Sequence, residues 1–266
     1  MTYKCLVIGD IHGSFKPIRD FHLRHNTNKE YNEAEKIMIC LGDFCANYFL
    51  DDAADGWHRD RQTKEKLGKY PFTYFVIRGN HEERPENLAA QYPDKWYKEH
   101  FLGGVVWVEK DFPYIKYAMD YPSYYEINGY KTMVFPGAYS VDKNYRLMMG
   151  YSWFKDELLT ESEMQMGREM VGALGGCDLV LSHTCPCIWE PTDLFFKSID
   201  QSTVDKTMER YLGEIEFHLD YKAWLWGHFH AYRDYPRTDG HRRTMLYNQE
   251  VIDLDQYMNN DEVELL

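Results

Sequence analysis

The stretch Phe-Val-Ile-Arg-Gly-Asn-His-Glu, residues 75–82, joins an apolar run to a polar turn. The run at residues 72–77 has the length and composition of a buried strand. Gly79 permits a sharp turn with a positive φ angle. The turn presents the amide of Asn80 and the imidazole of His81 at the carboxyl end of the strand, which is where open α/β sheets bind ligands. The stretch therefore predicts an α/β fold with a ligand site at this turn.

The same pattern occurs four more times along the chain. Apolar runs end in chemically versatile side chains at residues 5–9, 37–42, 179–182 and 223–227. The side chains that follow these runs are Asp10 with His12, Asp43, His183, and His228 with His230. If the five strands share one sheet, their carboxyl ends bring all of these groups to one edge. A single histidine at a strand end is usually structural, but five coordinated endings are hard to explain in that way because buried polar groups need partners.

The composition of the 266-residue chain limits its class. A hydrophobic content of 44% supports a sizeable core, and we expect one domain over residues 1–255 followed by an acidic tail over residues 256–266. The net charge of −13 argues against a general surface for nucleic acid or for an anionic membrane. The first residues have no signal-peptide pattern, and no apolar run approaches the roughly 20 residues that span a bilayer. We therefore expect a cytoplasmic protein.

Periodicity and turn residues predict the remaining elements. We expect helices over residues 13–24, 51–69, 160–174 and 204–218. The third of these begins with Thr160 and Glu163, which form a capping-box pattern. Short strands between residues 105 and 135, with an Asn-Gly turn at 128–129, predict a second and more antiparallel sheet. We expect irregular or partly helical structure at 84–104, loops at 137–146 and 188–203, and added strands at 245–247 and 251–254.

Seven side chains at the strand ends are candidate metal ligands. They are Asp10, His12, Asp43, Asn80, His183, His228 and His230. This mixed set of oxygen and nitrogen donors suits Mn, Fe, Zn or related ions. Seven ligands exceed what one ion needs, so two divalent ions are the economical interpretation, and Asp43 is suited to bridge them because a carboxylate has two oxygens. Two ions about 3.5–4 Å apart can clamp a phosphoryl group and acidify a water. His81 adjoins Asn80 without needing to ligate, so its imidazole can protonate a leaving group.

These five blocks resemble, in their order, those of the calcineurin-like metallophosphoesterase superfamily. The blocks are Gly-Asp-Ile-His-Gly at 9–13, Gly-Asp at 42–43, Gly-Asn-His-Glu at 79–82, His183, and Gly-His-Phe-His at 227–230. The resemblance implies a four-layer α/β/β/α sandwich with a dinuclear metal centre at the strand ends. It also implies that Asp10, His12 and His230 hold one ion, while Asn80, His183 and His228 hold the other. Asp43 would bridge the ions, and His81 would donate a proton or contact the phosphate.

Part of the chain is similar to the protein Ser/Thr phosphatases and the bacteriophage-type protein phosphatases. The second block of those proteins continues as Gly-Asp-x-Val-Asp-Arg-Gly, whereas this chain has Gly-Asp-Phe-Cys-Ala-Asn at 42–47. Ala46 replaces the Asp that orients the catalytic histidine, and Asn47 replaces a phosphate-clamping Arg. Both departures weigh against protein phosphatase activity. Arg78 is interpreted either as a phosphate contact or as part of a surface salt bridge.

We expect a metal-dependent phosphoesterase in which a metal-bound hydroxide attacks phosphorus and His81 assists the leaving oxygen. The expected substrate is a small phosphorylated molecule or a nucleotide. Two alternatives stay open. One is a protein Ser/Thr phosphatase, and the other is a non-catalytic binding scaffold of the same fold.

The segment at residues 137–146 is the candidate determinant of substrate choice. Lys143 and Arg146 would contact the phosphate or its neighbour, and Asp142 would orient one of them. The two tyrosines of the segment would stack on a ring of the substrate. The alternative is a surface loop whose charges pair with each other.

Overall fold

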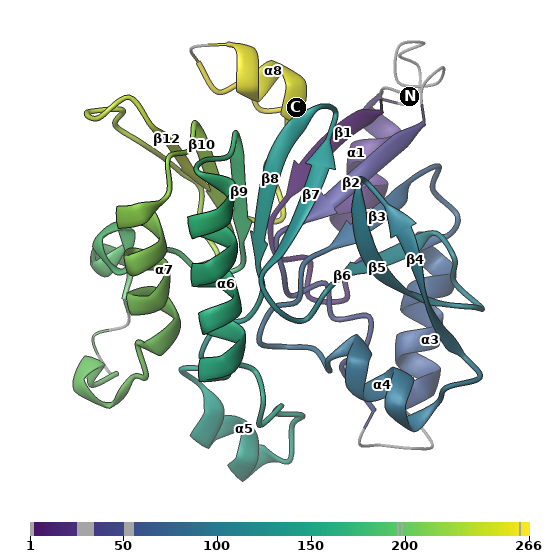
Figure 1. The fold of residues 1–266 in the computed structure, drawn as a ribbon. Helices are drawn as coiled ribbons and strands as arrows, with labels where there is room; N and C mark the ends of the chain where they lie inside the picture. Colours follow the sequence, from purple (N-terminus) through teal and green to yellow (C-terminus); the bar gives the residue numbers. More distant parts are fainter. Residues whose placement is uncertain (1–2, 26–34, 51–55, 196, 198, 261) are drawn as a thin grey trace.

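Two β-sheets lie face to face with helices on both outer sides in the computed structural model of the chain (Figure 1). The structure describes residues 3–25, 35–50, 56–195, 197, 199–260 and 262–266. Three apolar clusters separate successive layers of helix, sheet, sheet and helix. This arrangement confirms the predicted four-layer α/β/β/α sandwich.

The first sheet has the strand order β13-β1-β2-β3-β6-β5-β4. Its strands are β1 (Lys4–Ile8), β2 (Lys36–Cys40), β3 (Thr73–Val76), β4 (Trp96–Phe101), β5 (Gly104–Glu109), β6 (Ile115–Ala118) and β13 (Val251–Asp253). Strands β1, β2, β3 and β6 run parallel to one another. Along β1, Cys5 and Val7 face the second sheet, whereas Leu6 and Ile8 face the helices. Because both faces are covered, such strands have continuous apolar sequences.

The second sheet has the strand order β11-β12-β10-β9-β8-β7. Its strands are β7 (Ser123–Ile127), β8 (Tyr130–Phe135), β9 (Leu179–Ser182), β10 (Ala223–Trp226), β11 (Arg233–Tyr235) and β12 (Arg242–Met245). Strands β8, β9, β10 and β12 are parallel. On β10, Ala223 and Leu225 face the first sheet, while Trp224 and Trp226 face the outer helices. The core between the sheets is therefore built from alternate residues of each central strand.

Helices cover the outer face of each sheet. The first sheet is covered by α1 (Lys16–His25), α3 (Gly56–Leu67) and α4 (Pro85–Gln91), and the second by α6 (Glu161–Leu174) and α7 (Thr207–His218). Figure 1 shows α5 (Lys143–Met149) and α8 (Leu254–Asn259) at opposite ends of the sandwich. Three 3-10 turns, η1 (Cys187–Trp189), η2 (Thr192–Leu194) and η3 (Gln201–Thr203), connect β9 to α7. Within the described ranges, none of these helices is both long and apolar enough to cross a membrane.

The predicted start of α6 is confirmed in atomic detail. Thr160 is the N-cap residue, and its hydroxyl accepts a hydrogen bond from the Glu163 amide at 3.3 Å. The Glu163 carboxylate accepts a hydrogen bond from the Thr160 amide at 2.7 Å. This reciprocal capping box satisfies two amides that the helix itself leaves unpaired.

The predicted second sheet is wrong in its membership. Strands β5 and β6 join the first sheet, because β6 pairs in parallel with β3, and only β7 and β8 join the second sheet. The segment at 84–104, expected to be irregular or partly helical, contains the helix α4, but it also contains the edge strand β4, which was not predicted. Strand β4 alternates between buried or half-buried and exposed side chains at the sheet edge, so its sequence lacks the apolar run of a central strand.

The loop predicted at residues 137–146 is confirmed over residues 137–142 and wrong from Lys143, where α5 begins. The helix ends at Met149, and its C-cap residue Gly150 adopts a left-handed conformation. In this helix Arg146 is buried, whereas Tyr145 and the apolar side chains at residues 147–149 are exposed. Hydrophobic periodicity does not reveal a helix that buries a charged side chain and exposes its apolar ones.

The start of one predicted helix cannot be compared with the structure, and the start of the predicted acidic tail falls inside a helix. Residues 51–55 of the predicted helix 51–69 lie outside the described residues. The acidic tail expected over residues 256–266 begins within α8, where Tyr257 is buried against the core between the sheets. At the end of the chain, the Leu266 amide donates a hydrogen bond to the Val251 carbonyl at 2.9 Å.

Candidate metal centre

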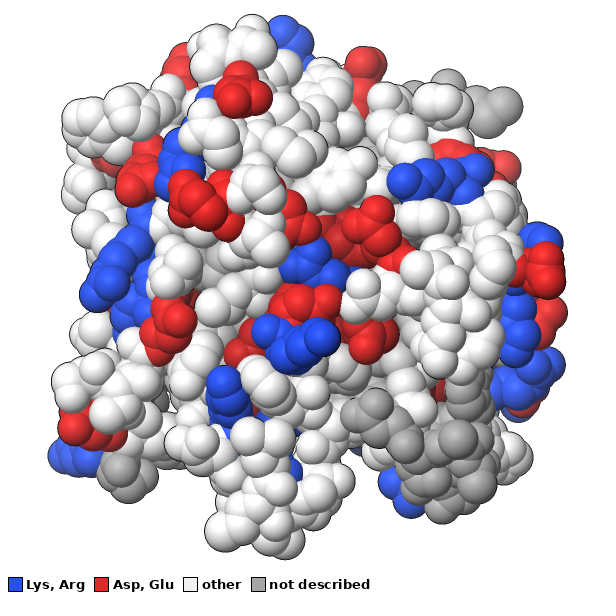
Figure 2. All heavy atoms as spheres, turned by 60° about the horizontal axis from the view of Figure 1, so that its bottom comes forward, with Lys and Arg blue, Asp and Glu red and all other residues white. Residues whose placement is uncertain are grey.

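The polar strand endings converge where the two sheets meet. The endings after β1, β2 and β3 belong to the first sheet, and those after β9 and β10 belong to the second. The five strands therefore do not share one sheet. The edges of two facing sheets nevertheless bring the seven candidate ligands together, because the carboxyl ends of these strands point the same way. This end of the sandwich carries α5 in Figure 1 and faces the reader in Figure 2.

Backbone strain is concentrated at these endings. Seven described non-glycine residues have positive φ angles, and four of them are His12, Asp43, His228 and His230, with values of 48°, 46°, 70° and 54°. The other three are Cys45, Leu102 and Asn128. Residues other than glycine rarely adopt this conformation, and it persists where the surrounding structure enforces it. Strain of this kind clusters at functional sites, and here it falls on four of the candidate ligands.

The first donor set consists of Asp10, His12 and His230. One ligand atom from each lies within 4.8 Å of the others. The Nε2 atoms of His12 and His230 are only 2.8 Å apart, so these nitrogens either share one proton or face one cation. One oxygen of Asp10 accepts the His228 amide at 2.8 Å, while Oδ1 has no hydrogen-bond partner among the described residues. A buried unpaired carboxylate oxygen beside two imidazoles fits a divalent ion.

The second donor set is organised around His183, which is fully buried. Its Nδ1 donates to the Leu41 carbonyl at 2.8 Å, which leaves the lone pair on Nε2. This nitrogen faces Asn80 Oδ1 at 3.0 Å and Asp43 Oδ1 at 3.4 Å. Burial lowers the pKa of His183, so in the neutral ring three acceptor atoms face one another. A bound cation between them would satisfy all three atoms.

Asp43 lies between the two donor sets. Its Oδ1 accepts the His81 amide at 2.9 Å, and its Oδ2 lies 3.9 Å from Nδ1 of His12. Burial would raise the pKa of Asp43, but the surrounding imidazoles lower it overall. Burial and the neighbouring Asp43 carboxylate raise the pKa of Asp10. Two buried carboxylates close together need compensating positive charge, which two ions would provide.

His228 completes the group that the sequence predicts. Its ring lies edge-on to that of His183, with centroids 5.0 Å apart. The structure therefore brings together all seven candidate ligands, although they come from turns spread over residues 10–230. Two glycines allow this close approach. A Cβ atom at Gly79 would lie 2.1 Å from Asp43 Oδ1, and one at Gly227 would lie 2.3 Å from Asp10 Oδ1.

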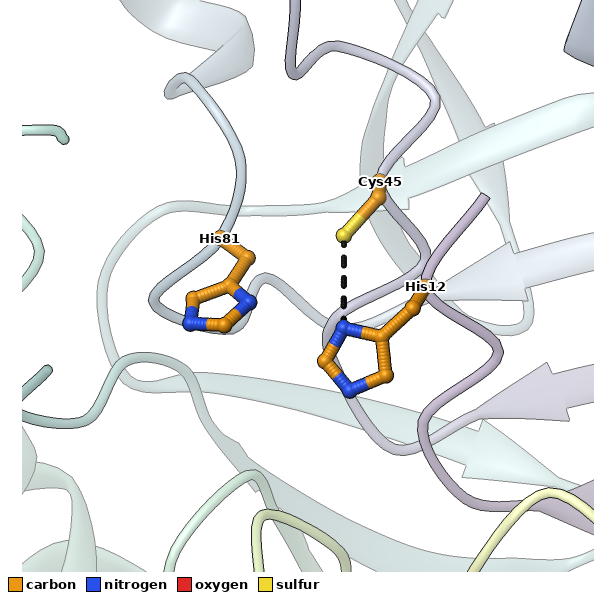
Figure 3. A group of neighbouring side chains, drawn as sticks. All are labelled: His12, Cys45 and His81. Carbon is orange, nitrogen blue, oxygen red and sulfur yellow. Dashed lines mark hydrogen bonds between the residues drawn. The ribbon is translucent and has the colours of Figure 1, made fainter. Parts of the chain in front are cut away.

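A cysteine adds a further donor beside the first set. Cys45 Sγ lies 3.9 Å from His12 Nδ1, and His81 is next to this pair (Figure 3). Burial raises the pKa of the Cys45 thiol well above its usual value. Because metals bind the thiolate rather than the thiol, this group is a weaker candidate than the imidazoles and carboxylates around it.

The substrate-contact residues proposed from the sequence separate into two groups. His81, Asp142 and Arg146 lie together, since Arg146 Nη2 is 2.8 Å from His81 Nε2 and Arg146 Nε donates to both Asp142 oxygens at 2.8 and 2.9 Å. Burial, followed by the nearby Arg146 charge, lowers the pKa of His81 to about 4. Lys143 is directed elsewhere, with its ammonium 4.0 Å from the centre of the Trp153 ring.

Arg78 also lies away from the other substrate-contact candidates. It is 3% exposed, and its guanidinium donates to the carbonyls of Gly79 and Glu157 at 3.1 and 2.9 Å. Its Nε lies 3.4 Å from the Asp120 carboxylate. The side chain therefore links the turn after β3 to the segment around Glu157. It is buried, so it forms no surface salt bridge, and it lies apart from the candidate site.

Several residues that orient the candidate ligands were missed by sequence reasoning. Ser140 accepts a hydrogen bond from Asn80 Nδ2 at 2.9 Å, which directs the amide oxygen of Asn80 toward His183. Ser140 is held in turn by Glu157, whose carboxylate accepts its hydroxyl at 2.5 Å and its amide at 3.1 Å. No motif marks either residue.

Glu82 is the one orienting residue that the opening stretch contains. Its buried carboxylate accepts the amides of Phe44, Cys45 and Gly79 at 3.4, 3.2 and 3.1 Å. It thereby ties the turn after β2 to the turn after β3. Burial and the Asp43 charge raise the pKa of Glu82 to about 8.

A cavity of about 250 Å³ opens beside the donor sets. Asp43, Asn80, His81, His228 and His230 line one side of it. The other side comes mainly from the segment between β9 and α7. A ligand in this cavity would reach the candidate metal ligands directly.

Comparison with known proteins finds one matching family model and several solved structures of similar fold. A family model described as calcineurin-like phosphoesterase matches residues 3–232. One solved structure is 14% identical and superposes with a TM-score of 0.55 over 100% of this chain and 99% of its own. The protein TT1561 of Thermus thermophilus is 11% identical, with a TM-score of 0.50 over 100% and 99% of the two chains. A dimetal phosphatase from Danio rerio is 12% identical, with a TM-score of 0.48 over 92% and 87%. No curated protein sequence matches significantly. At these identities the structural likeness shows the fold alone.

Proposed function

The chain belongs to the calcineurin-like phosphoesterase family, and on that premise we propose that this hydrolase of phosphoric esters cleaves a small phosphate ester at a centre for two divalent ions. The observation that carries the proposal is the pair of donor sets that share Asp43. Asp10, His12 and His230 would hold one ion. Asn80, His183 and His228 would hold the other, with Asp43 between them.

The bound ions would supply positive charge to the phosphoryl oxygens and lower the pKa of an attacking water. The nitrogen and oxygen donors suit Mn, Fe or Zn, and we propose Mn²⁺ as the first ion to supply in assays. The protein holds the donor atoms in fixed positions. Leu41, Ser140 and Glu82 hold the ligand turns through the hydrogen bonds described above.

We propose that His81 and Arg146 together contact the phosphoryl group. The guanidinium of Arg146 is anchored by Asp142 and by Tyr48, whose hydroxyl accepts its Nη1 at 3.0 Å. Its Nη2 lies 2.8 Å from Nε2 and 3.1 Å from Nδ1 of His81. Because a guanidinium only donates hydrogen bonds, a ring nitrogen of His81 acts as the acceptor here. This arrangement supports phosphate contact as the role of His81 ahead of proton donation to the leaving oxygen. Arginine is suited to this role because its fork of donors matches phosphate oxygens.

The protein phosphatase alternative is less well supported. Asn47, which stands where those enzymes have a clamping Arg, is 1% exposed, and its side-chain oxygen accepts Lys64 Nζ at 2.7 Å. Ala46 is fully buried and offers no group to orient a histidine. The non-catalytic alternative is weakened by the presence of every donor in both sets.

Hydrolysis of p-nitrophenyl phosphate and of its bis ester, with Mn²⁺ added, tests the proposal. We expect turnover of at least one ester by the wild type and its loss after chelation. The Asp43→Asn variant serves as the control, because it removes the shared carboxylate charge while keeping the side-chain shape. Turnover that is equal in wild type and variant would contradict the proposed centre.

A further inference from the structure

The cavity beside the donor sets has an apolar wall. Phe195 and Phe229 are stacked, with ring centroids 6.1 Å apart and planes 20° from parallel. Leu194, Ile199 and Val204 line the same cavity. Phe229 lies in the chain between two candidate ligands, His228 and His230, so its backbone lies beside the centre. Half-exposed aromatic and aliphatic side chains around a concave site are typical of small-molecule pockets.

Acidic side chains outnumber basic ones around this wall, and burial raises the pKa of one of them, Glu209, to about 7. Glu190, Asp205 and Glu209 line the cavity, and Lys206 is the only Lys or Arg among its described lining residues. The ammonium of Lys206 is paired with Glu190 and lies 4.8 Å from the centre of the Phe195 ring. Figure 2 shows acidic side chains near the middle of this face of the molecule, with basic side chains among them. An additional phosphate or carboxylate on a ligand would meet repulsion here.

Glu209 supplies the specific polar group of the cavity. It is 3% exposed, and its Oε1 accepts the Thr184 hydroxyl at 2.8 Å. Its Oε2 has no hydrogen-bond partner within the described part of the chain. Buried carboxyl oxygens are normally paired, so an unpaired one in a cavity wall is suited to a hydroxyl or amino donor on a ligand.

We infer that this cavity binds the alcohol portion of the substrate, and that this portion is a ring-bearing group with a hydroxyl or amino donor and no negative charge. The inference rests on the proposed function, because it places the phosphoryl group at the donor sets. In the reaction a water oxygen bonds to phosphorus and the phosphorus–oxygen bond to the ring-bearing alcohol breaks. The alcohol leaves with a proton that derives from the water. The acidic side chains disfavour nucleoside triphosphates as substrates. Monophosphate esters of uncharged aryl or heteroaryl alcohols fit the cavity.

Three aryl phosphates of similar leaving-group acidity test the inference with the Mn²⁺-loaded enzyme. They are 4-(hydroxymethyl)phenyl, 4-methylphenyl and 4-carboxyphenyl phosphate. We expect kcat/KM to be highest for the first and at least about tenfold lower for the third. Phe195→Ala should lower kcat/KM for the first ester by about tenfold, which is the usual size of a lost apolar contact. Glu209→Gln keeps the bond to Thr184 and should reduce the preference for the first ester over the second.

Binding of the free alcohol, 4-(hydroxymethyl)phenol, provides a readout that does not need turnover. We expect calorimetry or NMR titration to detect binding to the wild type and weaker binding to Phe195→Ala and Glu209→Gln. Phe217→Ala is the matched control, because Phe217 is 84% exposed at the end of α7 and lines no part of this cavity among the described residues. It should bind and turn over substrate as the wild type does.

The outcomes separate this inference from the proposed function. Hydrolysis of all three esters at equal rates, unchanged in Phe195→Ala, would overturn the inference and leave the phosphoesterase proposal intact. Alcohol binding that is lost in Phe195→Ala, with no hydrolysis of any ester, would support the cavity as a binding site and overturn the proposed function.

Discussion

Replacing Ser140 by Ala should weaken metal binding without touching a ligand. The hydroxyl accepts Asn80 Nδ2 at 2.9 Å and donates to Glu157 at 2.5 Å. Its removal leaves two buried polar groups unpaired, each at a cost of about 1–3 kcal/mol. We therefore expect the metal-free protein to lose about 2–6 kcal/mol of unfolding free energy. The Asn80 amide also becomes free to turn its oxygen away from His183.

The effect on metal affinity has a defined scale. Loss of a partner that orients a ligand typically lowers metal affinity about 10–100-fold, which corresponds to roughly 1.4–2.7 kcal/mol. Competition with a chromophoric chelator measures the affinity, and urea unfolding of the metal-free protein measures the stability. Ser162→Ala is the control, because Ser162 is exposed on α6. Affinity within twofold of the wild type, together with unchanged stability, would refute the role assigned to Ser140 and weaken that of Asn80.

The remaining predictions concern one buried cation and one buried acid. Arg146→Ala should lower the unfolding free energy by about 2–4 kcal/mol, because it leaves buried or half-buried partners unpaired. The same variant should also slow turnover, because it removes a phosphate contact. An unchanged urea midpoint and unchanged kinetics would contradict this prediction. Burial raises the pKa of Asp60 from 3.8 to about 7, so the folded state holds this proton more tightly than the unfolded state. The resulting stability is fully present below pH 3.8 and is lost as pH rises toward 7, by roughly 4 kcal/mol at most. Asp60→Asn keeps an acceptor for the Phe49 amide and should remove this part of the pH dependence in urea unfolding; identical pH profiles of the two proteins would show that Asp60 is not the source.

The strands and the candidate ligands were predictable because each ligand follows its strand directly. A buried run that breaks into Gly79-Asn80-His81 places the side chains by covalent connection alone. The capping box at Thr160 is equally local. The four layers followed from the family resemblance alone.

Features that depend on distant segments were not predictable from local patterns. The parallel pairing of β3 with β6 places β6 and β5 in the first sheet, and no turn residue encodes this strand order. Ser140 lies 60 residues from Asn80 in the chain, and Arg146 lies 65 residues from His81. Only the folded sandwich brings these partners together. Arg146 was proposed as a substrate contact from its loop, but its burial in a helix that exposes its apolar side chains could not be seen in the sequence.

The metal content of the active protein tests the central claim most directly. Protein stripped by a chelator and titrated with Mn²⁺ should regain activity as ions bind, and mass spectrometry or elemental analysis should find two ions per chain at full activity. Asp43→Asn should lower occupancy of both sites, because its carboxylate lies between the two donor sets. One ion or none per chain at full activity would contradict the two-ion centre.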